Sequence, residues 1–166
     1  MPAVTASPRL VLPTEPSVIS KQWRQQKFLL IGQAGIGKST LLSNDPDAFF
    51  IDTEGNLNHL AVKKLPCRSW EDFREIYAML VEAQAQGTFP YKTIVLDTTD
   101  RWLALAEEEV IQRAKERYRG AVADKIFTIG DIPEGNGWSN TTKLVMTALT
   151  KLNQLPAALW LVAHVK

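Results

Sequence analysis

Residues Gly32 to Ser39 read GQAGIGKS, which matches the phosphate-binding pattern G-x-x-x-x-G-K-[ST] in full. Such a loop surrounds phosphate oxygens with backbone N–H groups, and glycine lets the chain turn inward at low steric cost. An apolar run, Phe28 to Ile31, precedes it as a buried strand would. Thr40 to Leu42 follow as the start of a helix whose N-terminus would face the anion. The sequence therefore predicts a site for a nucleoside triphosphate.

Within this loop, each residue type has an expected role. Lys38 would reach the β- and γ-phosphates as a point charge, and the Ser39 hydroxyl would coordinate Mg²⁺. Backbone N–H groups would hold the phosphate oxygens. An ordinary glycine-rich turn with a solvated lysine is the alternative, and the strand–loop–helix setting makes it rare. The predicted nucleotide-binding set is Gly32, Gln33, Ala34, Gly35, Ile36, Gly37, Lys38, Ser39 and Thr40.

Asp97 ends a second apolar run, Thr93 to Asp97. There it would hold a Mg²⁺-bound water without touching the phosphate. The alternative is an aspartate that caps the next helix. Because open α/β sheets bind ligands at the carboxyl ends of their strands, we favour the metal role for Asp97 and expect Asp100 to be the cap.

Two further polar residues follow apolar runs. Glu54 lies two residues beyond the run that ends at Asp52, where its carboxylate could orient and polarise water for in-line attack on the γ-phosphate. On the residues alone, a solvated loop acid is an equal alternative, and Asp52 is the rival for the same task. His164 follows the last apolar run, where it could contact the γ-phosphate and report its hydrolysis.

Length and composition restrict the remaining possibilities. A chain of 166 residues fits one α/β domain with a sizeable core. The formal net charge of +1 gives no global field for nucleic acid or anionic membrane, although a local basic patch stays open. The single Cys67 excludes an internal disulfide and suits the cytoplasm. No run approaches the ~20 apolar residues of a membrane span. No zinc-site spacing occurs, and His59 is interpreted as structural or surface.

Apolar runs alternate with helical patterns along the chain. Strands are expected at about 27–31, 48–52, 62–65, 93–97 and 158–163. Helices are expected after the phosphate loop, at about 69–87, at 101–118 and around an apolar face of Leu144, Ala148, Leu149 and Leu152, with a loop at 130–137. Such continuous runs indicate a parallel sheet covered on both faces. Four prolines make residues 1–20 an extended or disordered lead-in to a domain at 21–166.

The residues at the strand ends resemble those of a RecA-like P-loop ATPase core. FFIDTEGNL (49–57) resembles the RecA segment whose glutamate is the catalytic base, a role that falls on Glu54. His164 falls where recombinases carry a glutamine that senses the γ-phosphate, so the match is of position and not of residue type. The catalytic residues implied are therefore Glu54, Lys38 and His164, with Ser39 and Asp97 as the metal-binding pair.

The chain is more similar still to small phage nucleotide-binding proteins with a RecA-like fold, some of which are single-strand annealing recombinases. The segments that carry this similarity are IGQAGIGKS, FIDTEG, PCRSWEDF, VLDT and AHVK, and it covers about residues 27–166. It implies a three-layer α/β sandwich with a mainly parallel sheet, whose last strand lies between the strands ending at Ile31 and Asp97. It also implies an ATPase using ATP and Mg²⁺ in phage or mobile-element DNA recombination or annealing, in the bacterial cytosol.

A RecA-like core normally continues past the point where this chain stops, with a DNA-contacting loop and further strands. We therefore expect that the C-terminal part of the domain is missing and that single-stranded DNA is contacted through regions absent from this chain. RecA-like ATPases also complete their sites with cations from a neighbouring subunit, so a homo-oligomer is expected. Without those regions, ATP hydrolysis should be slow and unaffected by single-stranded DNA.

Three other functions compete with this interpretation. A P-loop kinase acting on a small metabolite needs an arginine-rich lid, and the only arginine-rich stretch, Arg113 to Arg119, has the pattern of a helix end. A GTPase needs an [NT]-K-x-D signature, and Thr142 to Val145 (TKLV) lacks the aspartate. A nucleotide-gated binding module without turnover stays open. The DTEG setting of Glu54 favours water as acceptor, so we rank ATPase first.

Overall fold

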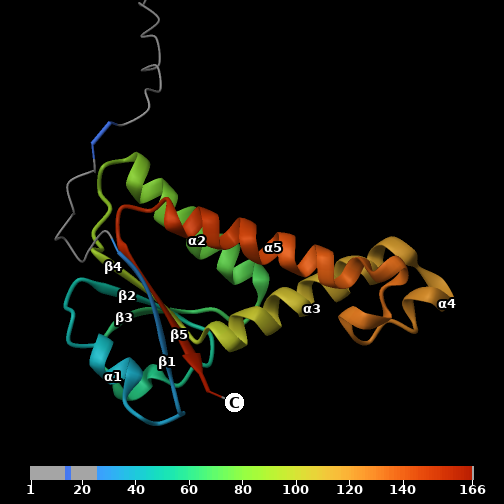
Figure 1. Ribbon diagram of the computed structural model, residues 1–166, viewed down its shortest axis with the longest axis horizontal. Helices are drawn as coiled ribbons and strands as arrows, with labels where there is room; N and C mark the ends of the chain where they lie inside the picture. Colours follow the sequence, from blue (N-terminus) through green and yellow to red (C-terminus); the bar gives the residue numbers. More distant parts are fainter. Residues whose placement is uncertain (1–13, 16–25, 166) are drawn as a thin grey trace, which may run out of the picture.

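A five-stranded parallel sheet forms the centre of the computed structural model, which describes residues 14–15 and 26–165 (Figure 1). Its strands lie in the order β1-β5-β4-β2-β3. Their bounds are β1 Lys27–Gly32, β2 Ala48–Asp52, β3 Lys63–Pro66, β4 Thr93–Asp97 and β5 Ala158–His164. The predicted parallel sheet is confirmed, and so is the place of the last strand between the first and the fourth. The expected lead-in, 1–20, falls outside the described residues except for 14–15.

The register brings particular residues to one edge of the sheet. β1 pairs Gly32 with His164 of β5, and β2 pairs Asp52 with Asp97 of β4. Because all the strands are parallel, their carboxyl ends meet at the same edge. The start of the phosphate loop, the two aspartates and the histidine therefore lie at one edge, although Gly32 and His164 are 132 positions apart along the chain.

Helices cover the sheet on both faces. The bounds are α1 Lys38–Leu42, α2 Trp70–Ala85, α3 Thr99–Tyr118, α4 Gly120–Ala123 and α5 Asn136–Asn153, with 3-10 turns η2 Leu57–His59, η3 Ile129–Asp131 and η4 Pro133–Gly135. Figure 1 shows α2, α3 and α5 together on one side and α1 on the other. Within the part of the chain that the structure describes, no helix has both the length and the apolar character needed to cross a membrane.

The core has two apolar layers, one on each face of the sheet, and a third cluster of Val110, Ala114, Ile126 and Ile132 beside α3. Ile51 and Leu96 pack with Trp70, Trp102 and other side chains of α2, α3 and α5. On the opposite face, Phe50, Val95 and Val162 pack with Leu42 of α1 and Leu57 of η2. Successive residues of β2 and β4 thus face opposite layers, and both layers exclude water. This is the physical reason for the continuous apolar runs in the sequence.

Side-chain caps fix the starts of two helices. Ser69 and Asp72 form a capping box at α2, in which the Ser69 Oγ accepts from the Asp72 N–H at 3.1 Å. At α3 the cap is Thr98, whose Oγ1 accepts from the Arg101 N–H at 3.5 Å. The expectation that Asp100 is the cap is therefore wrong. Asp100 lies in the first turn of α3, which begins two residues earlier than expected.

The predicted loop at 130–137 is more ordered than expected. It contains η3, η4 and the start of α5, and α4 precedes it. Gly137 explains why the segment is compact, because a Cβ atom at this position would lie 1.9 Å from the Ile129 carbonyl oxygen. Glycine composition alone suggested a loop, whereas here the missing side chain permits close contact between α5 and η3.

Trp102 should be a main determinant of stability. It is fully buried, and its ring centroid lies 5.3 Å from those of both Trp70 and Phe73. We expect Trp102→Ala to lower the free energy of unfolding by about 3–5 kcal/mol, because it leaves a cavity that the core cannot close. Leu103→Ala, at the next position of α3 and 38% exposed, should cost less than about 1 kcal/mol. Urea unfolding followed by circular dichroism compares them, and equal losses would contradict this packing.

Candidate active site

The loop between β1 and α1 adopts the turned-in path that the sequence predicts. Gly35 and Gly37 have φ angles of +77° and +92°, in the left-handed region where a side chain would be strained. Ile36 between them is 68% exposed, so its side chain does not anchor the loop. The backbone of the glycines therefore sets the shape of the loop.

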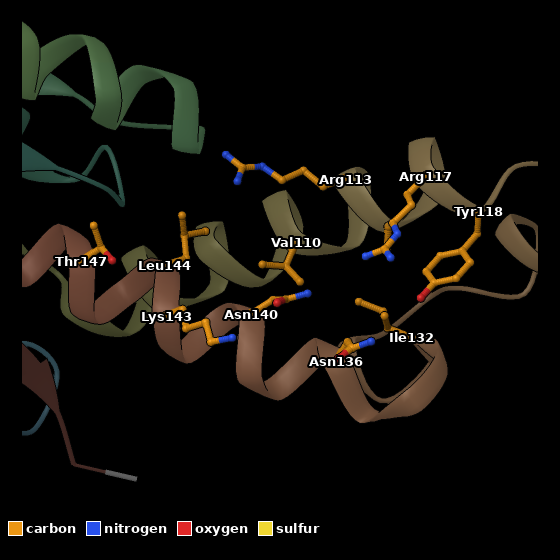
Figure 2. A pocket seen from close by; sticks show the side chains of 11 residues that line it. Val110, Arg113, Arg117, Tyr118, Ile132, Asn136, Asn140, Lys143, Leu144 and Thr147 are labelled. Atoms are coloured by element: carbon orange, nitrogen blue, oxygen red, sulfur yellow. The ribbon is translucent and has the colours of Figure 1, made fainter.

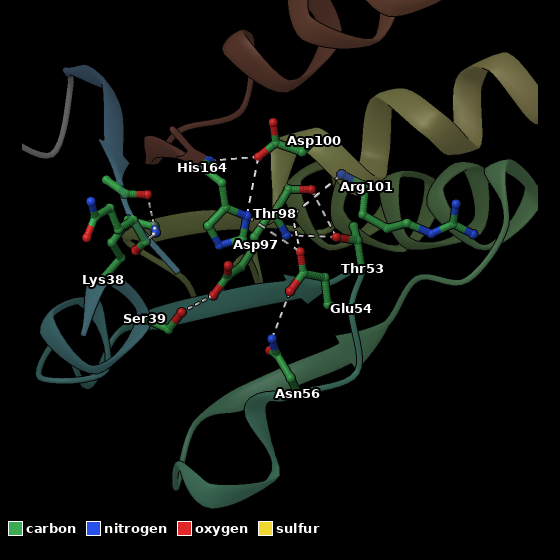
Figure 3. A network of polar contacts seen from close by, with 12 residues as sticks. Lys38, Ser39, Thr53, Glu54, Asn56, Asp97, Thr98, Asp100, Arg101 and His164 are labelled. Carbon is green, nitrogen blue, oxygen red and sulfur yellow. Dashed lines mark hydrogen bonds and ion pairs between the residues drawn. The ribbon is translucent and has the colours of Figure 1, made fainter. Parts of the chain in front are cut away.

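Lys38 is the buried cation of this loop. Its side chain donates hydrogen bonds from Nζ to the carbonyl oxygens of Gly32 and Gln33, both at 2.8 Å (Figure 3). Among the described residues, no carboxylate pairs with this ammonium. Within the described part of the chain, the hydrogen bonds of this ammonium go to neutral carbonyl groups. An incoming anion would therefore stabilise its charge further.

Ser39 and Asp97 meet beside the lysine. The Ser39 hydroxyl donates to Asp97 Oδ2 at 2.5 Å, joining the start of α1 to the end of β4. Asp97 is only 3% exposed, and burial raises the pKa of its carboxyl above the ordinary value. The hydrogen bond from Ser39 acts against this shift, while the nearby carboxylates of Glu54 and Asp52 add to it. A cation at this position would relieve both burial and repulsion.

The oxygen atoms of Ser39 and Asp97 fit a magnesium ion. Mg²⁺ prefers oxygen ligands and is usually bound by one or two protein groups, substrate phosphates and waters. The described residues include no group of three or more His, Cys, Asp or Glu side chains placed to hold a metal unaided. A metal here would depend on phosphate oxygens for part of its coordination.

Glu54 projects over the same edge from the turn after β2. Its Oε1 accepts from the Thr98 hydroxyl at 2.7 Å, and its Oε2 accepts from the Asn56 side-chain amide at 2.8 Å (Figure 3). Thr98 is itself fixed, since its backbone N–H donates to Thr53 Oγ1 at 2.7 Å. The carboxylate therefore has a defined position although the residue lies at the surface.

Asp52, the rival of Glu54, is used differently. It is 2% exposed, and its Oδ1 accepts from the Gly55 N–H at 2.7 Å. Its Oδ2 lies 3.4 Å from the Lys64 ammonium. Asp52 thus holds the turn that carries Glu54 and is not among the residues that line the adjacent cavity.

His164 lies between two carboxylates. Its Nδ1 is 3.6 Å from Asp100 Oδ2 and 3.9 Å from Glu54 Oε1. The same Asp100 oxygen accepts from the His164 backbone N–H at 2.7 Å. Asp100 therefore fixes the end of β5 relative to α3. The sequence did not reveal this contact, because the two residues lie 64 positions apart.

One cavity of about 210 Å³ unites these side chains. Lys38, Ser39 and Asp97 line it together with Glu54 and His164. Gly35, Gly37 and Thr40 complete the loop side, whereas Gly32, Gln33, Ala34 and Ile36 of the predicted set are not in the lining. Sequence reasoning did not place Asn56, Leu57, His59 and Thr98 here. Three of them belong to the turn after β2, whose path the residue types alone do not reveal.

The raised pKa of Asp97 leads to a prediction about stability. The native state binds the Asp97 proton more tightly than the unfolded state, so the free energy of unfolding falls as pH rises above the ordinary carboxyl pKa. At pH 7 we expect Asp97→Asn to raise the melting temperature of the ligand-free protein by about 2–4 °C for each kcal/mol recovered. The gain should shrink as pH falls toward about 4.

The same substitution should weaken Mg²⁺-dependent nucleotide binding, so stability and binding change in opposite directions. Thermal unfolding at several pH values and a nucleotide titration with and without Mg²⁺ measure the two effects. Asp124→Asn, at an exposed position next to α4, is the matched control and should change neither. A lower melting temperature for Asp97→Asn at pH 7 would contradict the prediction.

Comparison with known proteins adds an independent observation. A sequence profile of a protein family, described as an AAA domain, matches residues 24–166. A search of curated proteins gives no match. The matched region contains all five parallel strands and every residue of the cavity described above. The profile and the fold together indicate a nucleotide-binding core of the P-loop ATPase type, and the chain belongs to this AAA-domain family.

Proposed function

We propose that the chain binds ATP with Mg²⁺ and hydrolyses it to ADP and phosphate. The observation that carries this proposal is the single cavity in which Lys38, the Ser39–Asp97 pair and Glu54 meet. These groups come from three separate segments and differ in chemistry: a cation, a hydroxyl–carboxylate pair and a second carboxylate. Binding and hydrolysis of a triphosphate require this combination.

Phosphate binding is assigned to the loop. The Lys38 ammonium, which hydrogen-bonds to the Gly32 and Gln33 carbonyls, would turn to the β- and γ-phosphates. Backbone N–H groups between Gly35 and Thr40 would hold further phosphate oxygens. Because Lys38 has no carboxylate partner among the described residues, no ion pair has to break when the phosphates bind.

Ser39 and Asp97 would hold the magnesium ion, Ser39 directly and Asp97 through a water. When bound, Mg²⁺ supplies positive charge that offsets the charge developing on the phosphate oxygens. Asp97 is suited to this task because burial and two neighbouring carboxylates already disfavour its unpaired charge.

Glu54 is assigned to the attacking water. Hydrogen bonds from Thr98 and Asn56 each use part of one carboxylate oxygen and leave lone pairs to accept a proton from water. His164, whose Nδ1 lies 3.9 Å from Glu54 Oε1, would contact the γ-phosphate. Loss of that phosphate would then be sensed at the contact between His164 and Asp100 of α3. Asp52 is not assigned to the attacking water, because its Oδ1 accepts from the Gly55 N–H in the turn that carries Glu54.

The biological context that we propose is DNA recombination or annealing in a phage or mobile element. Support comes from the segments FIDTEG and AHVK, which resemble those of small phage nucleotide-binding proteins with a RecA-like fold. A homo-oligomer and contact with single-stranded DNA belong to the same proposal. ATP turnover measured with and without a single-stranded oligonucleotide, for this chain and for a longer one, tests this context, because this chain alone is expected not to respond.

Lys38→Ala should abolish binding of ATP–Mg²⁺ and leave the fold intact, because the ammonium contacts loop carbonyls and contributes no apolar packing. Titration with a fluorescent ATP analogue measures the affinity, and circular dichroism checks the fold. Lys125→Ala removes a cation outside the cavity and is expected to bind like the unmodified chain. Unchanged affinity in Lys38→Ala would show that the phosphate loop does not bind ATP–Mg²⁺ through Lys38.

Glu54→Gln should keep the affinity for ATP–Mg²⁺ and slow single-turnover hydrolysis by ~10²–10⁴, because only the proton acceptor is lost. Glu75→Gln, which alters an exposed acid of α2, should hydrolyse ATP at the unmodified rate. If Glu54→Gln matched the unmodified chain, another acid would have to take its role. If the unmodified chain bound ATP but never hydrolysed it, a binding module without turnover would replace the ATPase.

A further inference from the structure

A larger cavity lies away from the edge of the sheet. It has a volume of about 440 Å³ and lies between α3 and α5, toward their shared end near α4 (Figures 1 and 2). Val110, Ala114 and Ile132 are buried and form an apolar floor. None of the residues of the candidate active site lines it. Its volume is within the range of small-molecule sites.

The walls of this cavity carry positive charge. Arg113 is neutralised, since its guanidinium lies 2.7 Å from Glu109 Oε1. Arg117 of α3 and Lys143 of α5 have no carboxylate partner among the described residues. Figure 2 shows Arg117 extending from α3 toward α5 and Lys143 lying beside α5, and both residues line the cavity. Two cations without a carboxylate partner among the described residues therefore line one cavity, one from each helix, and Arg117 Cζ also lies 5.6 Å from the Tyr118 ring centroid.

Neutral donors lie between the two cations. Asn136 and Asn140 contribute side-chain amides to the same lining, and no acidic residue is part of it. Glu134, which is not part of the lining, accepts from the Asn136 side-chain amide at 3.1 Å and leaves this amide a second N–H to donate. The first turn of α5 itself holds no acid, and Glu134, two residues before it, is the nearest acid in sequence to this helix N-terminus. The cavity thus favours an anion with several acceptor oxygens.

We propose that this cavity binds a phosphate group, with Arg117 and Lys143 balancing its charge and the amides of Asn136 and Asn140 donating to its oxygens. A phosphate suits these walls better than a carboxylate, because its oxygens point in several directions and can accept from both helices at once. The apolar floor beneath would receive the organic part of the ligand. This site lies outside the proposed ATPase cavity, so its test is independent of ATP hydrolysis.

The phosphate can come from a mononucleotide or from the backbone of a single-stranded nucleic acid. A neighbouring cavity of about 250 Å³ shares Arg113, Leu144 and Thr147 with the first and adds Lys151 of α5. Cations therefore continue along α5 beyond the proposed site. A strand with several phosphates could follow this line, whereas a mononucleotide would not reach Lys151. The response to Lys151→Gln therefore distinguishes the two sources.

The test uses ¹⁵N-labelled Lys38→Ala chain, in which the phosphate loop no longer competes for the probe. AMP and a single-stranded oligonucleotide are titrated at low salt, and the NMR signals of the Asn136 and Asn140 amides are followed. Saturable shifts are expected at both residues. The double variant Arg117→Gln/Lys143→Gln should weaken binding by roughly tenfold or more, because charge-assisted hydrogen bonds are lost. Lys125→Gln, a cation outside the lining, should bind normally.

If Lys151→Gln weakens only the oligonucleotide, and the oligonucleotide binds more tightly than AMP, the site is a nucleic-acid backbone site. If AMP binds at least as tightly and neither probe responds to Lys151→Gln, it is a site for a small phosphomonoester. The proposal is overturned if neither probe shifts the Asn136 and Asn140 signals at millimolar concentration. It is also overturned if the shifts persist unchanged in the double variant, whose spectrum itself reports whether the fold is intact.

Discussion

A buried carboxylate at the end of β4 is the constraint on which the rest of the candidate active site depends. Asp97 is almost inaccessible to solvent and lies near Glu54 and Asp52, so the fold holds negative charges together that would separate in water. The Ser39 hydroxyl donates to Asp97, and the charge of His164 also stabilises this carboxylate, while Lys64 lies beside Asp52. Such a cluster lowers stability unless a cation binds, and it persists because the two apolar layers of the sheet fix the strand ends. A cation beside Asp97 would offset this repulsion, in keeping with the proposed function.

Hydrogen bonds between the strand ends also fix the positions of other groups of the site. The Thr53 hydroxyl donates to the Thr98 carbonyl at 2.9 Å and accepts from the Thr98 N–H, joining β2 to β4 just beyond their paired residues. Thr98 in turn holds Glu54, and Asp100 holds the backbone of His164. Glu54 and His164 are therefore each positioned by a neighbour to which we assign no chemical step, whereas Ser39 and Asp97 position each other.

The two cavities differ in what creates them. The smaller one arises where parallel strands end and a glycine loop turns back, so its lining comes from segments spread along the chain. The larger one arises where α3 and α5 extend past the sheet, and its charged walls follow from the faces that the two helices turn toward each other. The net charge near zero gives no sign of these charged walls, because acidic side chains elsewhere offset the cations. Among them are Glu108 and Glu109 of α3, which pair with Arg101 and Arg113.

The sequence by itself determined the class of fold and the phosphate loop. Continuous apolar runs specify buried parallel strands, and the spacing of GQAGIGKS specifies a loop, because both depend on neighbours within a few positions. Only the tertiary structure decided which acid faces the cavity: Glu54 enters it, whereas Asp52 turns back to the Gly55 N–H and Lys64. It also decided that Thr98 caps α3 while Asp100 binds β5, and that Gly137 packs on Ile129. These outcomes depend on contacts between residues far apart in the chain, which local patterns do not encode.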